Sequence, residues 1–357
     1  MTEPESPAAD GTTGPEGRDS WRIFHGTGVP PKDGPATIPP PPPWREFSGE
    51  PLQPPPPEDD RAARRRLGGA TVARPNLRDE EIDTVNAALV LRRPLLVTGP
   101  PGVGKSTLAY LAARELGLGR VLQWSIVSRT TLRDGLYEYD SIGRAQAIAA
   151  WRAGGPTEPG GVPPEQPPYL GDFITLGPLG TALLGWERPR VLLIDELDKS
   201  DIDLPNDLLH VLENGSYEIP ELIRGALRDA SVFTDDPERR AEIVGGRVEC
   251  REFPLVVITS NGEREFPAAF RRRCLPLEML PPSRQQLLAI VASHLRRSPE
   301  GVTALVDDFE RRVRDGGTQS VDQLLNAVQL TTAGGFQRDE DGRKLIEMLL
   351  RDLAKGR

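Results

Sequence analysis

The segment Gly99-Pro-Pro-Gly-Val-Gly-Lys-Ser106 constrains this chain more than any other feature of its sequence. It fits the pattern G-x-x-x-x-G-K-[ST] without a mismatch. An apolar run, Leu95–Val97, precedes it, and a stretch rich in helix-forming residues, Thr107–Leu116, follows it. A glycine loop between a strand and a helix turns backbone N–H groups toward an anion, and the helix N-terminus adds partial positive charge. The sequence therefore predicts a nucleotide-binding site.

The expected phosphate-binding residues form one continuous run: Gly99, Pro100, Pro101, Gly102, Val103, Gly104, Lys105, Ser106 and Thr107. Within this run, we expect Lys105 to reach the β- and γ-phosphates and the Ser106 hydroxyl to bind Mg²⁺. The alternative is an ordinary glycine turn before a helix. Such a turn does not require the fixed residues of the pattern together with a strand before them and a helix after them.

A second diagnostic stretch lies about 90 residues downstream, where the apolar run Val191–Ile194 leads into Asp195 and Glu196. This pattern is typical of a buried parallel strand whose carboxyl end faces a ligand crevice. We expect Asp195 to hold the Mg²⁺ shell and Glu196 to polarise the attacking water as general base. The alternative is a surface turn with two acids, but the spacing leaves room for the strands and crossovers that would bring the two stretches together.

Composition narrows the class of protein. The chain has 357 residues and a formal net charge of −9, and residues 1–60 hold 11 Asp and Glu against 4 Lys and Arg. An acidic chain does not favour broad binding to nucleic acid. Two cysteines, Cys250 and Cys274, are too few for a disulfide framework and suit a reducing compartment. The chain shows neither a signal peptide nor a long apolar run, so we expect a cytoplasmic protein without a membrane span.

The chain divides into three expected parts: a disordered Pro-rich arm over 1–73, an α/β nucleotide-binding domain over 74–280 and a helical lid domain over 281–357. Residues 1–66 hold 16 of the 37 prolines, so the arm is not expected to bury enough apolar area to fold. Its aromatic residues are interpreted as isolated in a flexible tail or, alternatively, as able to dock on a partner; they are Trp21, Phe24, Trp44 and Phe47. The basic run Arg61–Arg66 is interpreted as a solvated linker or, alternatively, as a contact to phosphate.

The expected fold class is a P-loop parallel sheet sandwiched by helices, with order beginning near Arg74. A further buried strand is expected over 253–261, ending on Ser260 and Asn261. A Pro- and Gly-rich surface insertion is expected over 154–168, and a loop or hairpin over 221–246. The lid is expected to contain helices over 284–295, 302–313, 321–330 and 343–353.

The stretch from Pro94 to Cys274 resembles AAA+ ATPases, and specifically their MoxR-like branch. The specific motifs are Asp195-Glu-Leu-Asp-Lys199, Pro205-Asn-Asp-Leu-Leu209 and the run from Thr259 to Cys274 that contains Asn261-Gly-Glu-Arg and Phe270-Arg-Arg-Arg. The resemblance implies an ATPase that uses ATP and Mg²⁺. It also implies a homo-oligomeric ring, usually hexameric, that remodels or matures a client protein, often with a von Willebrand A domain partner.

The resemblance also assigns roles to single residues. Asn261 matches the polar sensor that orients the lytic water; the alternative is an asparagine that caps a strand. Arg273, or as second choice Arg272, matches the arginine finger that enters the ATP site of the neighbouring subunit; the alternative for either is a structural salt bridge. The family commonly places a second sensor arginine at the start of a lid helix, but the window Gly316–Gln323 contains none.

Two other functions stay open from the sequence. One is a nucleic-acid-directed AAA+ motor, which the acidic composition and the lack of a recognisable DNA-binding module do not favour. The other is an ATP-gated scaffold with little turnover, whose Pro-rich arm would recruit partners. The presence of Glu196 favours hydrolysis over the scaffold.

Overall fold

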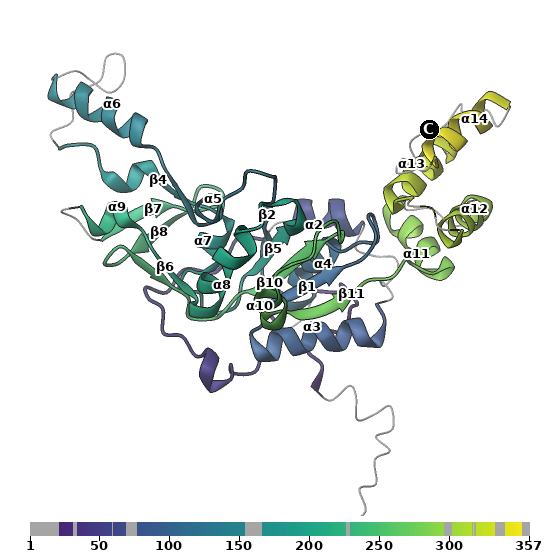
Figure 1. The fold of residues 1–357 in the computed structure, drawn as a ribbon, viewed down its shortest axis with the longest axis horizontal. Coiled ribbons are helices and arrows are strands. Elements are labelled where there is room, and N and C mark those ends of the chain that lie inside the picture. Colours follow the sequence, from purple (N-terminus) through teal and green to yellow (C-terminus); the bar gives the residue numbers. More distant parts are fainter. Residues whose placement is uncertain are drawn as a thin grey trace, which may run out of the picture.

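The computed structural model describes residues 21–30, 34–58, 60–68, 77–153, 166–225, 229–295, 302–315, 317, 319–332 and 340–351. Its centre is a five-stranded sheet of order β11-β1-β10-β5-β2, in which every neighbouring pair is parallel (Figure 1). The strands are β1 (Leu95–Thr98), β2 (Leu122–Ser125), β5 (Val191–Asp195), β10 (Leu255–Ser260) and β11 (Leu275–Glu278). This sheet confirms the predicted α/β fold class.

The two faces of the sheet are covered by different helices, because neighbouring residues along a strand point to opposite sides. One face packs on α3 (Asp79–Leu91) and α4 (Thr107–Leu116), and the row Leu95, Val257 and Leu193 belongs to this cluster. The other face packs on α7 (Pro178–Ala182), α8 (Leu204–Asn214) and α10 (Ala268–Arg273), and its strand residues include Leu96, Leu192, Ile194 and Ile258. The strands are therefore buried on both sides, as their continuous apolar runs require.

A second, four-stranded sheet of order β3-β4-β7-β8 lies beside the first. Its strands are β3 (Tyr137–Tyr139), β4 (Ile174–Leu176), β7 (Ala230–Phe233) and β8 (Arg240–Ile243). The antiparallel pair β7–β8 confirms the hairpin predicted within 221–246. A separate pair joins β6 (Ser216–Glu218) to β9 (Arg247–Glu249). The predicted insertion over 154–168 falls largely on residues 154–165, which lie outside the described residues.

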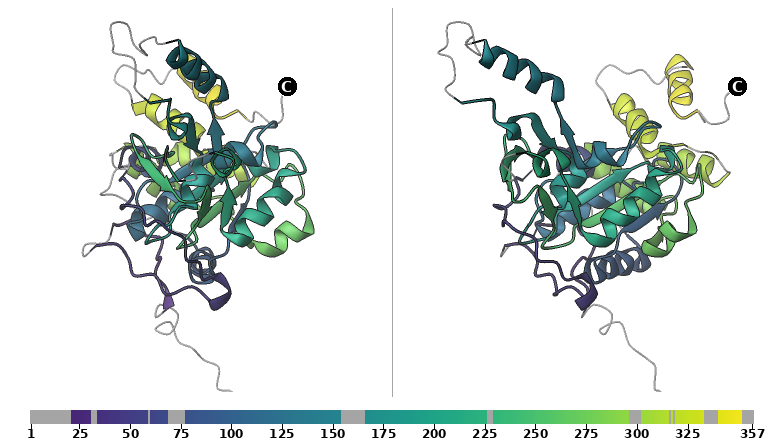
Figure 2. Two further views of the ribbon diagram at one scale, coloured as in Figure 1. Left: turned by 90° about the vertical axis from the view of Figure 1, so that its left-hand side faces the viewer. Right: turned by 60° about the vertical axis from the view of Figure 1, so that its left-hand side comes forward.

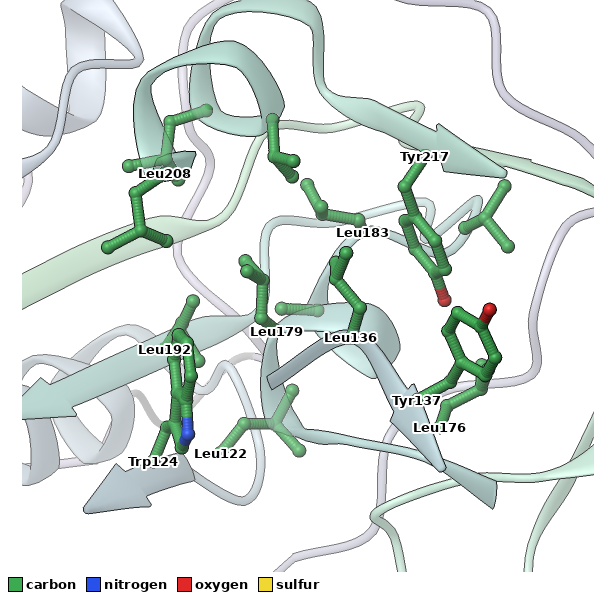
Figure 3. Packing of buried hydrophobic residues seen from close by; sticks show 14 of the residues in the cluster. Leu122, Trp124, Leu136, Tyr137, Leu176, Leu179, Leu183, Leu192, Leu208 and Tyr217 are labelled. Carbon is green, nitrogen blue, oxygen red and sulfur yellow. The ribbon is translucent and has the colours of Figure 1, made fainter. Parts of the chain in front are cut away.

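The second sheet shares its apolar core with the first (Figure 3). Trp124 and Leu192 of the central sheet face Leu179 of α7, while Tyr137 and Tyr217 stack with their ring centroids 6.5 Å apart. Short helices α5 (Leu132–Leu136) and α9 (Pro220–Ile223) border this region. Helix α6 (Ser141–Arg152) has no buried residue and projects away from the sheets (Figures 1 and 2).

The C-terminal part is helical, as predicted, and has its own apolar cluster, which includes Leu287, Phe309 and Leu324. Its helices are α11 (Arg284–Leu295), α12 (Thr303–Arg314), α13 (Val321–Thr332) and α14 (Glu340–Leu349). They lie at the opposite end of the molecule from α6 (Figures 1 and 2). Within the described ranges, no helix combines the length and the apolar character that a membrane crossing requires.

The N-terminal segment corrects the prediction of a disordered arm over 1–73. Phe24 is completely buried in the cluster that contains α3 and α4. The Asn86 side chain of α3 accepts hydrogen bonds from the backbone N–H groups of Ile23 and Phe24 at 2.7 and 2.9 Å, and it donates one to the Phe24 carbonyl at 2.7 Å. The described residues from 21 to 58 are therefore packed on the nucleotide-binding domain, and order begins well before Arg74.

Glu115 of α4 fixes the next turn of this segment. Its carboxylate accepts backbone N–H groups from His25 and Thr27 at 2.6 Å each and from Gly28 at 2.9 Å. Farther along, the Gly49 N–H donates to the Cys250 carbonyl at 3.1 Å. These contacts satisfy backbone groups that no helix or strand of the segment pairs.

The arm prediction fails for residues 21–58 because composition does not register partners that are distant in sequence. The partner residues Asn86 and Glu115 read as ordinary helix positions when the sequence is taken alone. The proline runs also pre-set the backbone, so the segment loses less conformational entropy on docking than a flexible chain would. Residues 1–20 and 69–76, including Arg74, lie outside the described residues.

We expect Phe24→Ala to lower the free energy of unfolding by about 3–5 kcal/mol, because it removes a fully buried aromatic side chain. Urea unfolding of the full chain measures this change. The matched control is Trp44→Ala in the same segment, since Trp44 is 78% exposed and its loss should change stability by no more than about 0.5 kcal/mol. Equal stability of the two variants would show that the segment is not docked in solution.

Candidate nucleotide site

The glycine loop lies between β1 and α4, at the carboxyl end of the parallel sheet. Gly99 and Gly102 have φ angles of 145° and 77°, which favour glycine over residues with side chains. A side chain at Gly102 would collide with Ser320, just before α13, and one at Gly99 would collide with the backbone of Met279. The loop therefore needs glycine both for its own conformation and for the close approach of neighbouring chain segments.

Lys105 lies at the centre of the site and is 6% exposed. Its ammonium group donates to the carbonyls of Gly99 and Pro100 at 2.8 and 2.9 Å and to Asn261 Oδ1 at 2.7 Å. Burial lowers the pKa of Lys105, and the nearby carboxylates of Asp198, Asp195 and Glu196 oppose that shift. All three acceptors are neutral, so an anion placed in the loop would offer this ammonium group a stronger hydrogen bond.

Asp195, the last residue of β5, lies beside the serine of the loop. Its Oδ1 atom accepts hydrogen bonds from Ser106 Oγ at 2.6 Å and from Thr259 Oγ1 at 2.7 Å. Gln123 on β2 donates to Oδ2 at 3.3 Å. Ser106 and Asp195, which are 89 positions apart in the chain, are thus brought together as predicted.

The Ser106–Asp195 pair fits a hard divalent cation. Magnesium prefers oxygen ligands and is usually held by one or two carboxylates together with substrate phosphates and water. Within the described residues, no group of three or more His, Cys, Asp or Glu side chains is placed to hold a metal. A cation held by Asp195 and Ser106 would take its remaining ligands from phosphate oxygens and water, as magnesium usually does.

Glu196 follows the strand tip in an unusual backbone conformation. Its φ of 61° lies in the left-handed region, which non-glycine residues seldom adopt. The backbone N–H of Glu196 donates to Thr259 Oγ1 at 2.8 Å, and this bond helps to hold the conformation. The side chain accepts from Lys199 Nζ at 2.6 Å and from Asn261 Nδ2 at 3.3 Å. A residue held in a strained conformation at a strand tip is a recurrent feature of active sites.

Asn261 joins the other residues of the site, because its side chain bonds both Lys105 and Glu196. It directly follows β10, which lies between β1 and β5. Asp198 fixes its backbone by accepting the N–H groups of Asn261 and Glu263 at 2.9 and 3.1 Å. The structure therefore brings together Lys105, Ser106, Asp195, Glu196 and Asn261.

The two residues predicted as the arginine finger, Arg272 and Arg273, do not lie in the cleft that contains Lys105. Arg271, Arg272 and Arg273 form the exposed end of α10 and do not line the cleft beside Lys105. Arg273 makes an ion pair with Glu213 at 3.2 Å, with the two side chains 46% and 55% exposed. Arg272 Nε donates to the Ala268 carbonyl at 3.3 Å within its own helix. These arginines are accessible to a second molecule.

Sequence reasoning missed Thr259, which bridges the Asp195 side chain and the Glu196 backbone. The available signal was its place near the carboxyl end of the predicted strand over 253–261, two residues before Asn261, because side chains two apart in extended chain lie on one face. Sequence reasoning also missed helix α2 (Asp60–Leu67), which contains the basic run Arg61–Arg66 and packs on α4. Arg66 lies over the Tyr110 ring, 5.5 Å from its centroid.

The nucleotide cleft has a volume of about 420 Å³ and three kinds of wall. The glycine loop and the strand tips form the polar wall. Residues of α11 and α13, including Ile290 and Leu325, form a second wall, and Arg65 and Arg66 of α2 form part of a third. The basic run is therefore part of a helix and not of a linker, and Arg65, although exposed, lines the cleft together with Arg66. In the second-sensor window, Gly316 and Thr318 lie outside the described residues, and the window residues that line the cleft are Val321 and Asp322.

We expect the double variant Arg65→Ala, Arg66→Ala to bind nucleotide about 10-fold more weakly, because hydrogen bonds to charged groups contribute about 1.5–3 kcal/mol when well formed. Equilibrium titration of the full chain with a fluorescent ATP analogue measures the change. Arg61→Ala is the matched control, since Arg61 is an exposed residue of the same helix that does not line the cleft. Unchanged affinity in the double variant would exclude a contact between α2 and the nucleotide.

The parallel sheet, the glycine loop after β1 and the acidic tip of β5 define a P-loop nucleoside triphosphatase fold. The AAA domain of the dynein-related subfamily matches residues 94–274, just over half of the chain. The chain belongs to this family and contains an AAA+ domain, the domain of nucleotide-dependent ATPases. The matched span has the same limits, Pro94 and Cys274, as the AAA+ resemblance seen in the sequence.

Among solved structures, the chain is similar to NtrX from Brucella abortus, determined in complex with ADP. The sequences are 16% identical, the TM-score is 0.31, and the similarity covers 69% of this chain. It covers 48% of the NtrX chain, so this chain spans about half of that length. No curated protein sequence matches the chain significantly.

Proposed function

We propose that this chain is an ATPase of the MoxR-like branch that hydrolyses Mg²⁺·ATP and uses the resulting subunit motion to remodel a client protein. The observation that carries the proposal is the joined set of side chains at the strand tips. Asn261 bonds Lys105 at 2.7 Å and Glu196 at 3.3 Å, and Ser106 bonds Asp195 at 2.6 Å. These contacts support assigning Lys105 to phosphate binding, Glu196 to the role of general base, and Ser106 and Asp195 to the metal.

Each residue has a chemical task in this proposal. Lys105 exchanges its bonds to the Gly99 and Pro100 carbonyls for bonds to the β- and γ-phosphates, which are charged and therefore stronger acceptors. Ser106 and Asp195 would hold Mg²⁺, which would neutralise phosphate charge when bound. Glu196 accepts a proton from the attacking water, whose oxygen bonds to the γ-phosphorus while the bond to the β-phosphate oxygen breaks. Asn261 orients that water.

The second part of the proposal is a ring in which a neighbour completes the site. Arg272 and Arg273 lie at the surface, away from the cleft of their own chain, so they require a second subunit if they act on a phosphate. A ring built head to tail presents the same edge to every site, which an isologous dimer does not. The resemblance to the MoxR-like branch favours a hexamer and a client with a von Willebrand A domain.

Phosphate release from ATP by the purified full chain tests the proposal. We expect turnover with Mg²⁺ and none with excess EDTA. ATP binding without turnover would support the ATP-gated scaffold instead. Stimulation by duplex DNA that disappears as salt is raised would support the nucleic-acid motor. Capture from a lysate by the Glu196→Gln variant with ATP, compared with the same variant without ATP, would then identify the client.

A further inference from the structure

The Arg93 side chain contacts the C-terminal end of helix α10, which carries the arginine triplet Arg271–Arg273. Arg93 precedes β1, and its guanidinium group contacts the C-terminus of α10, 180 positions later in the chain. Its Nε atom donates to the Arg273 carbonyl at 3.2 Å, and its Nη2 atom donates to the carbonyls of Arg272 and Cys274. One side chain therefore binds three successive carbonyls where the triplet ends.

These carbonyls need an external partner, because the last carbonyls of a helix have no donor within the helix. Helix α10 is six residues long, so capping matters for most of its length. The planar guanidinium presents several N–H donors in a fixed geometry, which suits a row of adjacent acceptors better than a single ammonium group does. Arg93 thus sets the direction in which the end of α10 presents its side chains.

The surroundings hold the arginines without neutralising most of them. Four arginines belong to this corner: Arg93, whose side chain contacts the end of α10, and Arg271–Arg273 in the last turn of that helix. Among the described residues, Glu213 at the end of α8 is the only acid that forms an ion pair with any of the four. The uncompensated positive charge suits an anion brought by another molecule, such as the triphosphate in a neighbouring subunit.

Glu213 is itself fixed by the N-terminal segment. Arg45 donates to the backbone carbonyls of Leu212 and Glu213 at 3.1 and 3.0 Å and lies over the Phe253 ring, 4.3 Å from its centroid. Burial lowers the pKa of Arg45. The carboxylate that contacts Arg273 therefore comes from a helix whose end is capped by another arginine, so both supports of the triplet are anchored.

We propose that Arg93 is a positioning residue for the arginine finger, acting through the carbonyls of Arg272 and Arg273 on the ATP site of the adjacent subunit. This inference rests on the proposed ring ATPase. Arg93 does not touch nucleotide in either subunit. Loss of the Arg93 side chain leaves the ATP site of its own subunit intact and impairs the ATP site of the adjacent subunit.

Mixing two variants tests this inference. Arg93→Ala alone should lower kcat about 100-fold, the loss expected when a catalytic group is misplaced by about 1 Å, with nucleotide affinity unchanged. Glu196→Gln subunits cannot hydrolyse ATP but keep an intact finger. In a 1:1 mixture, an Arg93→Ala site beside a Glu196→Gln subunit regains its finger, so the mixture should be several-fold more active than the sum of the separate proteins. No gain on mixing overturns the inference, provided that the mixed subunits assemble.

Two further variants keep the test decisive. The double variant Arg93→Ala, Arg273→Ala should have the same kcat as Arg273→Ala, because a residue that acts only through the finger has no effect once the finger is gone. If the loss of kcat in the double variant equals the product of the losses in the two single variants, Arg93 acts elsewhere than through the finger. If Arg93→Ala fails to fold, Arg93→Lys replaces it; we expect partial activity, and activity equal to wild type would overturn the inference. A wild-type chain without turnover would instead refute the proposed function.

Discussion

Arg273→Ala is expected to lower kcat for ATP hydrolysis by about 10³–10⁵-fold, the range observed when an arginine finger is absent from related triphosphatases. In the proposed ring, the Arg273 guanidinium of one subunit stabilises charge on the transferring phosphoryl group in the next. The present ion pair with Glu213 does not prevent this role, because a pair this exposed contributes no more than about 1 kcal/mol.

Steady-state kinetics with ATP and equilibrium binding of an ATP analogue check this expectation together. Affinity should change little, since the finger acts mainly on the transition state. Arg272→Ala is the matched comparison from the same helix and should lower kcat much less than Arg273→Ala does. A greater loss in Arg272→Ala would move the finger to Arg272, and a small loss in both variants would remove the triplet from catalysis.

Glu196→Gln is expected to lower kcat by about 10²–10⁴-fold, the usual contribution of a positioned general base. Glutamine has nearly the same shape and keeps an oxygen that can accept from Lys199 or Asn261, so the cleft and its affinity for ATP should persist. Single-turnover hydrolysis separates this effect from product release. Glu218→Gln, an exposed position on β6 outside the cleft, is the control. Equal rates in Glu196→Gln and wild type would exclude Glu196 as the base.

Much of the nucleotide site could be predicted from the sequence because its determinants are local. The glycine loop specifies its own backbone, and the apolar runs before Lys105 and Asp195 specify buried strands. Parallel strands bring their carboxyl ends to one edge of a sheet, so strand identity alone was sufficient to place Ser106 beside Asp195. The role of Asn261 came from the family resemblance, and the structure places this residue after β10, between β1 and β5.

The parts that could not be predicted depend on contacts between segments that are distant in sequence. Glu115 reads as a surface residue of α4 until the segment around Thr27 is seen to donate its backbone N–H groups to it. Likewise, Arg93 reads as a solvated charge before a strand, and only the tertiary structure places it on the carbonyls of α10. Composition indicates how much apolar area a segment can bury by itself. It does not indicate which hydrogen-bond partners a distant segment supplies.

Equilibrium titration of wild type and Lys105→Ala with an ATP analogue tests whether the cleft around Lys105 binds Mg²⁺·ATP. Lys105 is a buried cation of the phosphate loop. Its charged partner in the complex is the nucleotide phosphate, and loss of one partner of a buried charged pair costs about 2–5 kcal/mol. We predict that wild type binds the analogue and that Lys105→Ala binds it at least about 100-fold more weakly. Equal affinity in the two proteins, or no binding by wild type, would show that this cleft is not an ATP site that depends on Lys105.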